Sequence, residues 1–298
     1  MRAGKILIFV MLCALLLPMA AFGAETEVLP PRTYAFEQKA YRIYESETLY
    51  FRMENIKVNG VRCYLTKVWM KNPARQIRKV TAAWEKNVML PRHMAEKIPE
   101  AALIINGSGF WSKKYPDVPE EYPGKVSDYY NTPWGSLTVT DGAVYRNLEG
   151  LKYCGLTLEA DGLHMYTGED NEKVLAANPT QTWCFRDLCP MQRNGEVLTP
   201  EEWPFAETKA RRTVIGRMDR NNYLILSVTN EGGFGLSLYQ VNDFFLENFE
   251  GLEWLYNLDG GPSSALLIRK QGSSRLKTVM GGGAKDVDIM AFTELPEE

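Results

Sequence analysis

The chain has 298 residues, of which 45% are hydrophobic and 24% are charged, and its formal net charge is −3. These values are ordinary for globular proteins, so the chain can bury a sizeable core in one large domain or two small ones. The slight acidic excess argues against nucleic acid as a partner, because proteins that bind phosphate backbones need a basic surface.

Residues 1–24 have the pattern of a secretory signal peptide. Arg2 and Lys5 form a basic start, residues 6–17 are an unbroken apolar run, and small residues follow Pro18. The run is shorter than the roughly 20 residues of a membrane-spanning helix, which favours a cleaved signal over a retained anchor. We therefore expect an exported mature chain, 25–298, that is secreted or held in the cell envelope without a stable membrane span.

The first predicted element of the mature chain is a hairpin in the region 48–70. Apolar and polar residues alternate over 48–58, Asn59-Gly60 follows, and a second strand-like run covers 61–70. Asn-Gly supplies the positive φ angles that a tight two-residue turn needs. A short helix is expected further on, over residues 92–97.

An apolar strand over 102–105 then ends in Asn106-Gly107, and a loop-rich stretch, 111–133, follows. This stretch carries four tyrosines, Tyr115, Tyr122, Tyr129 and Tyr130, and its prolines include Pro116, Pro119 and Pro123. The rings form either a lip that stacks on sugar rings or a covering flap whose rings are buried. The sequence favours neither alternative.

Four cysteines remain after signal cleavage: Cys63, Cys154, Cys184 and Cys189. An even number in an exported chain favours disulfides, and Cys184 and Cys189 are closest in sequence, although the pairing does not follow from the sequence. A zinc site is a poor alternative, because there is no C-x-x-C pair and His93 and His164 are the two histidines.

A second hairpin is predicted from strands at 213–218 and 223–228 around the turn residues 219–222. Calcium is a weak alternative at this turn, since Asp219, Asn221 and Asn222 offer oxygen ligands. However, these residues lack the spacing of a calcium loop, and a hairpin turn explains them equally well. We therefore expect no cofactor.

The last predicted helix contains apolar residues at three- and four-residue spacing before Gly251: Leu238, Val241, Phe244, Phe245 and Phe249. Many short strands, few helices and 24 glycines predict an α+β fold of mostly antiparallel or mixed β-sheets with a few flanking helices. Because the chain has no internal repeat and no linker, residues 25–298 are expected to form a single domain whose motif-bearing core covers about 100–298.

The most informative stretch is 257–264, Asn-Leu-Asp-Gly-Gly-Pro-Ser-Ser, which lies between two apolar runs. Gly260 and Gly261 let the backbone approach a ligand closely and place N–H donors beside the Asp259 carboxylate. A hairpin turn explains the same residues. The two interpretations are compatible, because functional residues often lie on turns.

Two other glycine-marked segments add further groups. Asn106 offers a side-chain amide, and Arg212 offers a positive charge just before a strand. Together with the Asp259 carboxylate, the segment 257–264 also contains the hydroxyls of Ser263 and Ser264. An arginine fork matches phosphate oxygens, so the set suits an anionic ligand with hydroxyls, such as a phosphate-bearing sugar. An arginine near a strand is more commonly a surface charge or a salt-bridge partner.

In this order, the three segments resemble those of the phosphodiester glycosidase family. The similar motifs are Asn-Gly-x-x-Phe at 106–110, Arg-Thr-x-Ile-Gly at 212–216 and Asn-Leu-Asp-Gly-Gly-x-Ser-Ser at 257–264. Residues 287–292 also look like the family's last strand. The resemblance runs from about Val61 to the end of the chain.

The resemblance implies hydrolysis of the bond between a sugar's anomeric carbon and an esterified phosphate. Asp259 is then expected to activate water or act as the nucleophile, and Arg212 to neutralise the phosphate. The amides of Gly260 and Gly261 are expected to donate to substrate oxygens. The substrate-binding set is completed by the other motif residues: Asn106, Gly107, Thr213, Asn257, Ser263 and Ser264.

One departure from the family pattern bears on activity. Many members carry Asp-Gly-Arg after the strand 224–228, whereas this chain has Thr229-Asn230-Glu231. Glu231 is the candidate for a second catalytic carboxylate from a shifted position; otherwise the change alters substrate choice or removes turnover. Ser108 stands where a second glycine is common, which is a milder change.

The sequence therefore predicts an exported phosphodiester glycosidase acting on a sugar-1-phosphodiester in a cell-wall, capsular or other envelope glycan. The alternative is a non-catalytic polysaccharide-binding or envelope-assembly protein on the same scaffold, and a purely structural exported protein is a third. The expected partner is a sugar phosphate or polysaccharide, and not nucleic acid.

Overall fold

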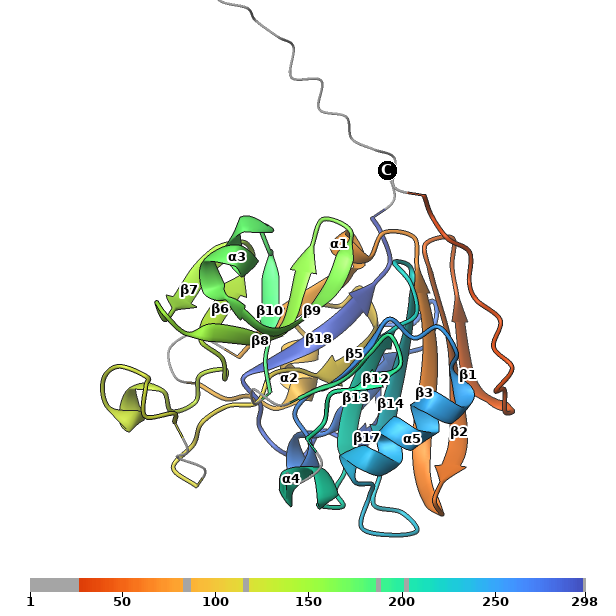
Figure 1. The fold of residues 1–298 in the computed structure, drawn as a ribbon. Helices are drawn as coiled ribbons and strands as arrows, with labels where there is room; N and C mark the ends of the chain where they lie inside the picture. Colours follow the sequence, from red (N-terminus) through yellow and green to blue (C-terminus); the bar gives the residue numbers. More distant parts are fainter. Residues whose placement is uncertain (1–26, 83–86, 115–117, 186–188, 201–203, 297–298) are drawn as a thin grey trace, which may run out of the picture.

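The computed structural model describes residues 27–82, 87–114, 118–185, 189–200 and 204–296. They form three β-sheets, and every pair of neighbouring named strands is antiparallel (Figure 1). This confirms the expected α+β fold with mostly antiparallel sheets. The expected signal peptide, 1–24, lies outside the described residues. Among the described residues, no helix has the length and apolar character that would let it cross a membrane.

The largest sheet has eight strands, in the order β1 Ala40–Glu45, β2 Leu49–Val58, β3 Val61–Met70, β14 Asn222–Val228, β13 Arg212–Arg217, β15 Trp254–Asn257, β11 Pro190–Arg193 and β12 Glu196–Val197. The first predicted hairpin is confirmed as β2 and β3. Asn59 and Gly60 join the two strands with φ angles of 46° and 81°. The left-handed conformation at both positions explains the Asn-Gly pair.

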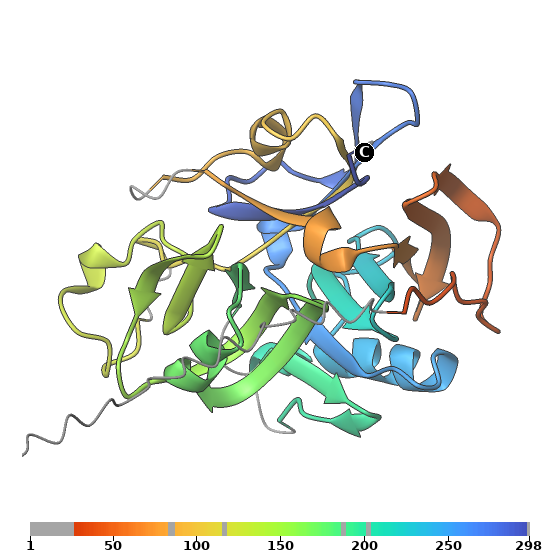
Figure 2. The same ribbon diagram turned by 90° about the horizontal axis from the view of Figure 1, so that it is seen from above.

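The other two sheets have five strands each. One has the order β7 Ala143–Asn147, β6 Leu137–Thr140, β10 Gln181–Trp183, β8 Lys152–Glu159 and β9 Gly162–Asp170. The other has the order β17 Leu276–Gly281, β16 Ala265–Arg269, β5 Ala101–Asn106, β18 Asp288–Thr293 and β4 Ile77–Thr81. Viewed from above, the three sheets are separate groups (Figure 2). Between them lies a core with side chains from all three, such as Ile105, Leu156 and Ile225.

The helices are short: α1 Pro73–Gln76, α2 Pro91–Ala95, α3 Asn171–Ala176, α4 Pro204–Glu207 and α5 Leu238–Asn248, with 3₁₀ turns at Val126–Asp128 and Gly261–Ser263. The helices predicted over 92–97 and before Gly251 are thus confirmed as α2 and α5. Ser237 accepts a hydrogen bond from the Gln240 amide at the start of α5, in a capping box. The apolar face of α5 packs on the eight-stranded sheet (Figure 1).

The second predicted hairpin is confirmed as β13 and β14, and its turn is held by Asp219. One Asp219 oxygen accepts hydrogen bonds from the amides of Asn221 and Asn222, and the other pairs with Arg32. The turn residues considered for calcium therefore serve the hairpin and anchor the N-terminal segment. Leu29 also bonds to Asn221 here, at the end of β13 opposite to Arg212.

The tyrosines of the loop 111–133 that the structure describes are mostly buried, which favours the covering flap. Trp111, Tyr122 and Tyr129 are 3%, 9% and 7% exposed and meet edge to face. The Arg146 guanidinium lies over the rings of Trp111 and Tyr129. Tyr115 and Pro116 lie outside the described residues.

The four cysteines at 63, 154, 184 and 189 are buried thiols that form no disulfide in the described part of the chain, so the expected disulfides are not present in this structure. All four side chains lie in apolar cores, and burial raises the pKa of the Cys63 thiol to about 12. They act here as small apolar side chains.

Candidate active site

Asn106 joins the three motif segments that the sequence singled out. Its side-chain oxygen accepts hydrogen bonds from the Thr213 hydroxyl (2.6 Å) and the Ala265 amide (2.9 Å). Its side-chain nitrogen donates to the Asp259 carbonyl at 2.7 Å. Asn106 is fully buried, and so is Thr213. The two residues were expected to bind substrate, but their side chains hold β5, β13 and the Asp259 turn together.

The Asp259 turn is fixed mainly through its backbone. The Asp259 amide donates to the Gly107 carbonyl at 3.1 Å. The Gly260 amide donates to the Asp259 carboxylate itself at 2.7 Å, and the Gly261 amide donates to the Arg211 carbonyl at 2.9 Å. Both glycine amides were expected to donate to substrate, and in this structure both have partners within the chain.

The two glycines are needed for different reasons. A Cβ on Gly260 would lie 2.9 Å from the Arg211 carbonyl oxygen, which is tighter than ordinary packing allows. Gly261 has open space around the same position, but its φ angle is +57°. The first glycine thus permits a close approach and the second a left-handed turn.

A buried ion pair supports the Gly107 side of the site. Asp288 Oδ2 lies 3.2 Å from Lys79 Nζ, and both side chains are fully buried. Asp288 Oδ1 accepts a hydrogen bond of 2.7 Å from the Ser108 amide. Lys79 Nζ also donates to the Thr182 carbonyl at 2.6 Å. Burial lowers the pKa of Lys79, and Asp288 opposes that shift.

Asp286, two residues before Asp288, brings a second carboxyl close enough to Asp259 for the two charges to interact. Its side chain is 1% exposed, and neither of its carboxyl oxygens has a hydrogen-bond partner of normal geometry among the described residues. Burial, followed by the negative charges of Asp259 and Asp288, raises the pKa of Asp286 well above its usual value. The nearby Ser263 hydroxyl opposes the rise. Asp286 therefore stays protonated to a higher pH than an ordinary aspartate.

Unpaired buried polar atoms also occur on both sides of Asp259. Asn257 Oδ1 and Ser264 Oγ are buried without a hydrogen-bond partner among the described residues. Ser263, whose hydroxyl is near Asp286, is partly exposed. Buried polar atoms without partners are uncommon in folded proteins and often mark functional sites. The arrangement is suited to polar ligands at the Asp259 turn.

Arg212 does not present its guanidinium at this turn. The residue is 1% exposed, and its side chain donates to the carbonyls of Phe205, Thr208 and Leu236. The guanidinium also lies 4.6 Å from the centre of the Phe205 ring. Burial lowers the pKa of Arg212 to about 10. The proposed phosphate-binding arginine thus packs α4 and the chain at Leu236 against β13.

Glu231 is likewise placed away from Asp259. Its carboxylate pairs with Arg62 on the exposed surface, and its carbonyl accepts from the Arg62 amide at 2.9 Å. Arg62 belongs to β3, three strands from β15 in the sheet, or about 14 Å at the usual strand spacing. The structure therefore gives Glu231 an anchoring contact instead of the expected place beside the catalytic carboxylate.

The residues that sequence analysis missed are Lys79, Asp286 and Asp288. The sequence could have indicated the two aspartates, because they are two residues apart where a predicted strand begins. Residues at that spacing in an extended chain point to the same side. Lys79 gave no signal, since its position on β4 beside β18 depends on a long-range strand pairing.

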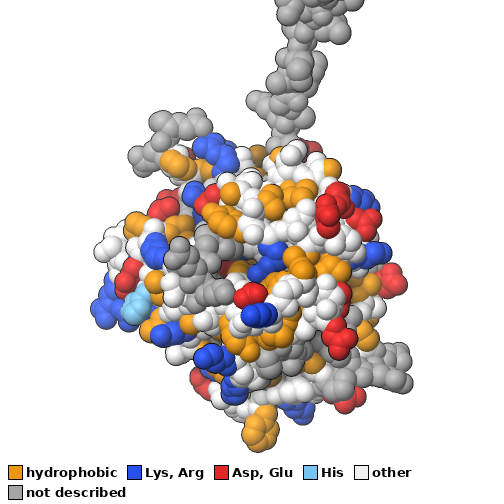
Figure 3. All heavy atoms as spheres, turned by 90° about the vertical axis from the view of Figure 1, so that its left-hand side faces the viewer, with side chains coloured by type: hydrophobic (Ala, Val, Ile, Leu, Met, Phe, Trp, Pro, Cys, Tyr) orange, Lys and Arg blue, Asp and Glu red, His pale blue; other side chains and the backbone are white. Residues whose placement is uncertain are grey.

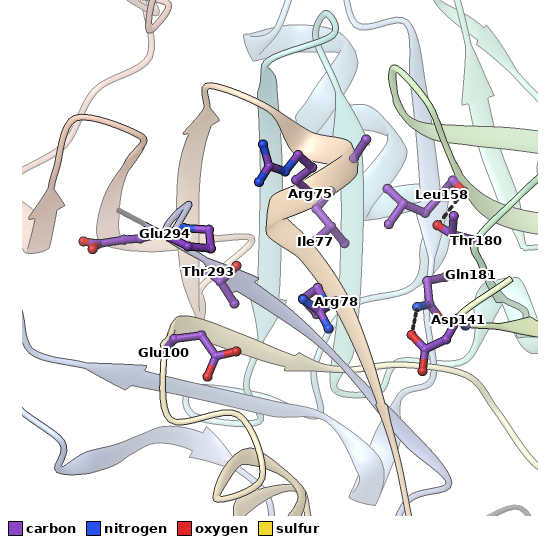
Figure 4. Close-up of a pocket in the computed structure, with 12 residues that line it drawn as sticks. Arg75, Ile77, Arg78, Glu100, Asp141, Leu158, Thr180, Gln181, Thr293 and Glu294 are labelled. Carbon is purple, nitrogen blue, oxygen red and sulfur yellow. Dashed lines mark hydrogen bonds between the residues drawn. The ribbon is translucent and has the colours of Figure 1, made fainter. Parts of the chain in front are cut away.

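The described residues also form a pocket of about 410 Å³ that is separate from this site (Figure 4). Arg75 and Arg78 line it together with Glu100 and Asp141, so its charges are mixed. Asp141 is hydrogen-bonded to Gln181 at 2.8 Å. The pocket adjoins Thr293, at the opposite end of β18 from Asp288, and it contains none of the motif residues.

Among the described residues, one group of histidine and carboxylates has the spacing to hold a metal ion. The ligand atoms of Glu159, Asp161 and His164 lie within 4.8 Å of one another, at the β8–β9 turn. A His164–Asp161 hydrogen bond of 2.5 Å already accounts for the close approach of these two groups. On the face shown in Figure 3, basic and acidic side chains are interspersed.

Comparisons with known proteins point to the same region. A family model described as phosphodiester glycosidase matches residues 100–288, more than half of the chain. A search of curated proteins finds no match.

Solved structures share the fold at low sequence identity. The catalytic domain of zebrafish N-acetylglucosamine-1-phosphodiester alpha-N-acetylglucosaminidase, auto-inhibited by its pro-peptide, is similar with a TM-score of 0.60 and 16% identity, over 84% of this chain and 85% of that one. A hypothetical protein from Synechocystis is similar with a TM-score of 0.50 and 13% identity, over 84% of this chain and 63% of that one.

Proposed function

The chain belongs to the phosphodiester glycosidase family, and we propose that it is an exported hydrolase that cleaves a sugar-1-phosphodiester linkage in an envelope glycan. The observation that carries the proposal is the pairing of Asp259 with a second, buried carboxyl at Asp286. Most glycosidases cleave the bond at the anomeric carbon with a pair of carboxyl groups that lie in different environments.

In the proposed reaction, the bond between the anomeric carbon and the bridging phosphate oxygen breaks. The electron pair leaves with that oxygen, as a phosphate monoester, and a water oxygen forms the new bond to carbon. Asp259 faces the developing positive charge on the sugar and takes the proton from the attacking water. A phosphate monoester is a good leaving group, so strong acid assistance is less important than in ordinary glycoside cleavage.

The turn geometry supports this role for Asp259. One carboxylate oxygen is oriented by the Gly260 amide at 2.7 Å, and the backbone on both sides is held by Asn106 and Gly107. A carboxylate fixed in this way does not have to be oriented again during the reaction. Because burial raises the pKa of Asp286, protonation of this carboxyl reduces the negative charge beside the substrate phosphate.

The test is release of free sugar from synthetic sugar-1-phosphodiesters by the chain 25–298. We expect turnover by the parent chain and a loss of at least about 100-fold in Asp259→Asn, the scale of one acid–base group. The matched control is Asp243→Asn, which removes an exposed carboxylate on α5, on the far face of the large sheet. Absence of sugar release by the folded parent chain, or full activity in Asp259→Asn, would overturn the proposal.

A non-catalytic glycan-binding protein is the second candidate. It is favoured by the internal bonding of both glycine amides and by the anchoring of Glu231 to Arg62, which leave fewer groups for chemistry. Binding of a sugar phosphodiester measured by calorimetry, without sugar release over a long incubation, is the result that distinguishes it.

A further inference from the structure

Arg211 lies directly between the Asp259 turn and the loop that carries Phe234. On one side, its carbonyl accepts the hydrogen bond from the Gly261 amide at 2.9 Å. On the other side, a Cβ on Gly235 would lie 2.1 Å from the Ala210 carbonyl oxygen and 2.8 Å from the Arg211 nitrogen. The backbone of one residue thus links the candidate catalytic turn with a neighbouring surface loop.

The Arg211 side chain differs from that of Arg212. It is half-buried, and it makes no hydrogen bond or ion pair with the described part of the chain. Along β13, Arg212 faces Phe205 and Leu236, whereas Thr213 faces Asn106. Because alternate residues of an extended chain share a side, Arg211 is on the side of Thr213, Asn106 and the Asp259 turn.

Phe234 is the most exposed large apolar residue among those described, at 85%, and the next is Tyr145 at 52%. Gly232 and Gly233 precede it and Gly235 follows it, with φ angles of +89° at Gly232 and +90° at Gly235. Both ends of the loop are nevertheless fixed by backbone hydrogen bonds. The Glu231 carbonyl accepts from the Arg62 amide, and Leu236 and Ala210 exchange two backbone hydrogen bonds of 3.0 and 3.2 Å.

We propose that Arg211 and Phe234 form the subsite for the group on the far side of the phosphodiester. Arg211 pairs with the phosphate oxygens, and the Phe234 ring packs on the flat apolar face of a ring in the leaving alcohol. An arginine fork suits a phosphate, and an aromatic face suits a sugar or aryl ring. The inference rests on the proposed function, and it gives the preferred substrate class as diesters whose second group contains a ring.

The experiment compares diesters that share one sugar-1-phosphate and differ in the second group: a hexose, a phenyl group, or linear glycerol. We expect Phe234→Ala to lower kcat/KM for the two ring-bearing diesters about 10-fold, the scale of one aromatic stacking contact. The same variant should leave the glycerol diester unchanged. The hexose and phenyl substrates distinguish a sugar from an aromatic ring as the preferred group.

Arg211→Ala should lower kcat/KM for all three diesters about 10- to 100-fold and reduce the dependence on salt, because a charge-assisted contact to phosphate is lost. Arg211→Lys should recover part of the rate, since it keeps the charge without the fork. The matched controls are Arg275→Ala and Leu246→Ala, which remove an exposed arginine and an exposed apolar side chain elsewhere.

Calorimetric binding of the same diesters separates this inference from the proposed function. If the parent chain binds the ring-bearing diesters without cleaving them, and Phe234→Ala weakens that binding, the subsite holds and the hydrolase proposal fails. If the chain cleaves the diesters, and Phe234→Ala and Arg211→Ala both behave like the parent chain, the subsite is wrong and the hydrolase proposal stands.

Discussion

The Asp259 turn and the Arg211–Phe234 rim are adjacent, but they are built in opposite ways. The backbone of the turn is held by hydrogen bonds to Asn106 and Gly107, and the buried pair of Lys79 and Asp288 supports it from behind Gly107. The rim holds an arginine without a partner in the described chain and an exposed aromatic ring between glycines. We infer that the turn is specified by folding, whereas the rim is open to change in substrate choice.

The largest effect on stability is expected from Lys79→Met, which tests whether the buried ion pair holds the Asp259 turn. Without the ammonium group, Asp288 is left as an uncompensated buried charge, so we expect a loss of about 3–5 kcal/mol in the free energy of unfolding. Urea denaturation measures it. The double variant Lys79→Met, Asp288→Asn should recover much of the loss, because the amide oxygen still accepts from Ser108. If the double variant recovers none of the lost unfolding free energy, Lys79 does not stabilise the fold by pairing with Asp288.

Gly107→Ala tests the same region through sterics. The new Cβ would lie 1.9 Å from Asp288 Oδ1 and 3.0 Å from the Trp183 ring, so we expect a loss of about 1–3 kcal/mol or more in unfolding free energy. Gly261→Ala is the comparison, since it meets no atom within 4 Å and should cost about 1–2 kcal/mol through its positive φ alone. Equal losses in thermal or urea unfolding would contradict the close packing at Gly107.

Asp286→Asn tests whether the pKa of Asp286 is raised, through the pH dependence of the unfolding free energy. The folded chain holds the Asp286 proton above the ordinary aspartate pKa, so the parent chain loses stability as pH rises from about 4 toward the raised value. The asparagine variant lacks this loss. Its unfolding free energy relative to the parent should therefore improve as the pH rises above about 4, the ordinary aspartate pKa. A difference that does not vary with pH would mean that the pKa of Asp286 is not raised.

The smallest effect is expected at the outer end of the rim. Glu231→Gln removes an exposed ion pair with Arg62, which is worth about 0–1 kcal/mol, and leaves the backbone bond in place. Sugar release should stay within about two-fold of the parent rate, because Glu231 is remote from Asp259. A large loss of turnover would restore Glu231 as a catalytic candidate.

Local sequence signals predicted the hairpins and α5 well. Asn59-Gly60 and the spacing from Leu238 to Phe249 act through neighbouring residues, so periodicity and turn chemistry were sufficient. The three motif segments also meet as expected, through Asn106. Their side-chain roles did not follow from residue type. Arg211 and Arg212 are adjacent residues of the same type, so the sequence does not show which of them is buried. In the structure, strand alternation and the contact with Phe205 bury Arg212 and leave Arg211 half-buried.

The anchoring of the N-terminal segment has a practical consequence. Leu29 and Arg32 are tied to the β13–β14 turn, and six strand residues separate that turn from the start of β13 beside the Asp259 loop. That is about 20 Å at the rise of a β-strand. A chain immobilised on a bead or sensor through a tag placed before residue 27 should consequently keep the Asp259 turn directed away from the support.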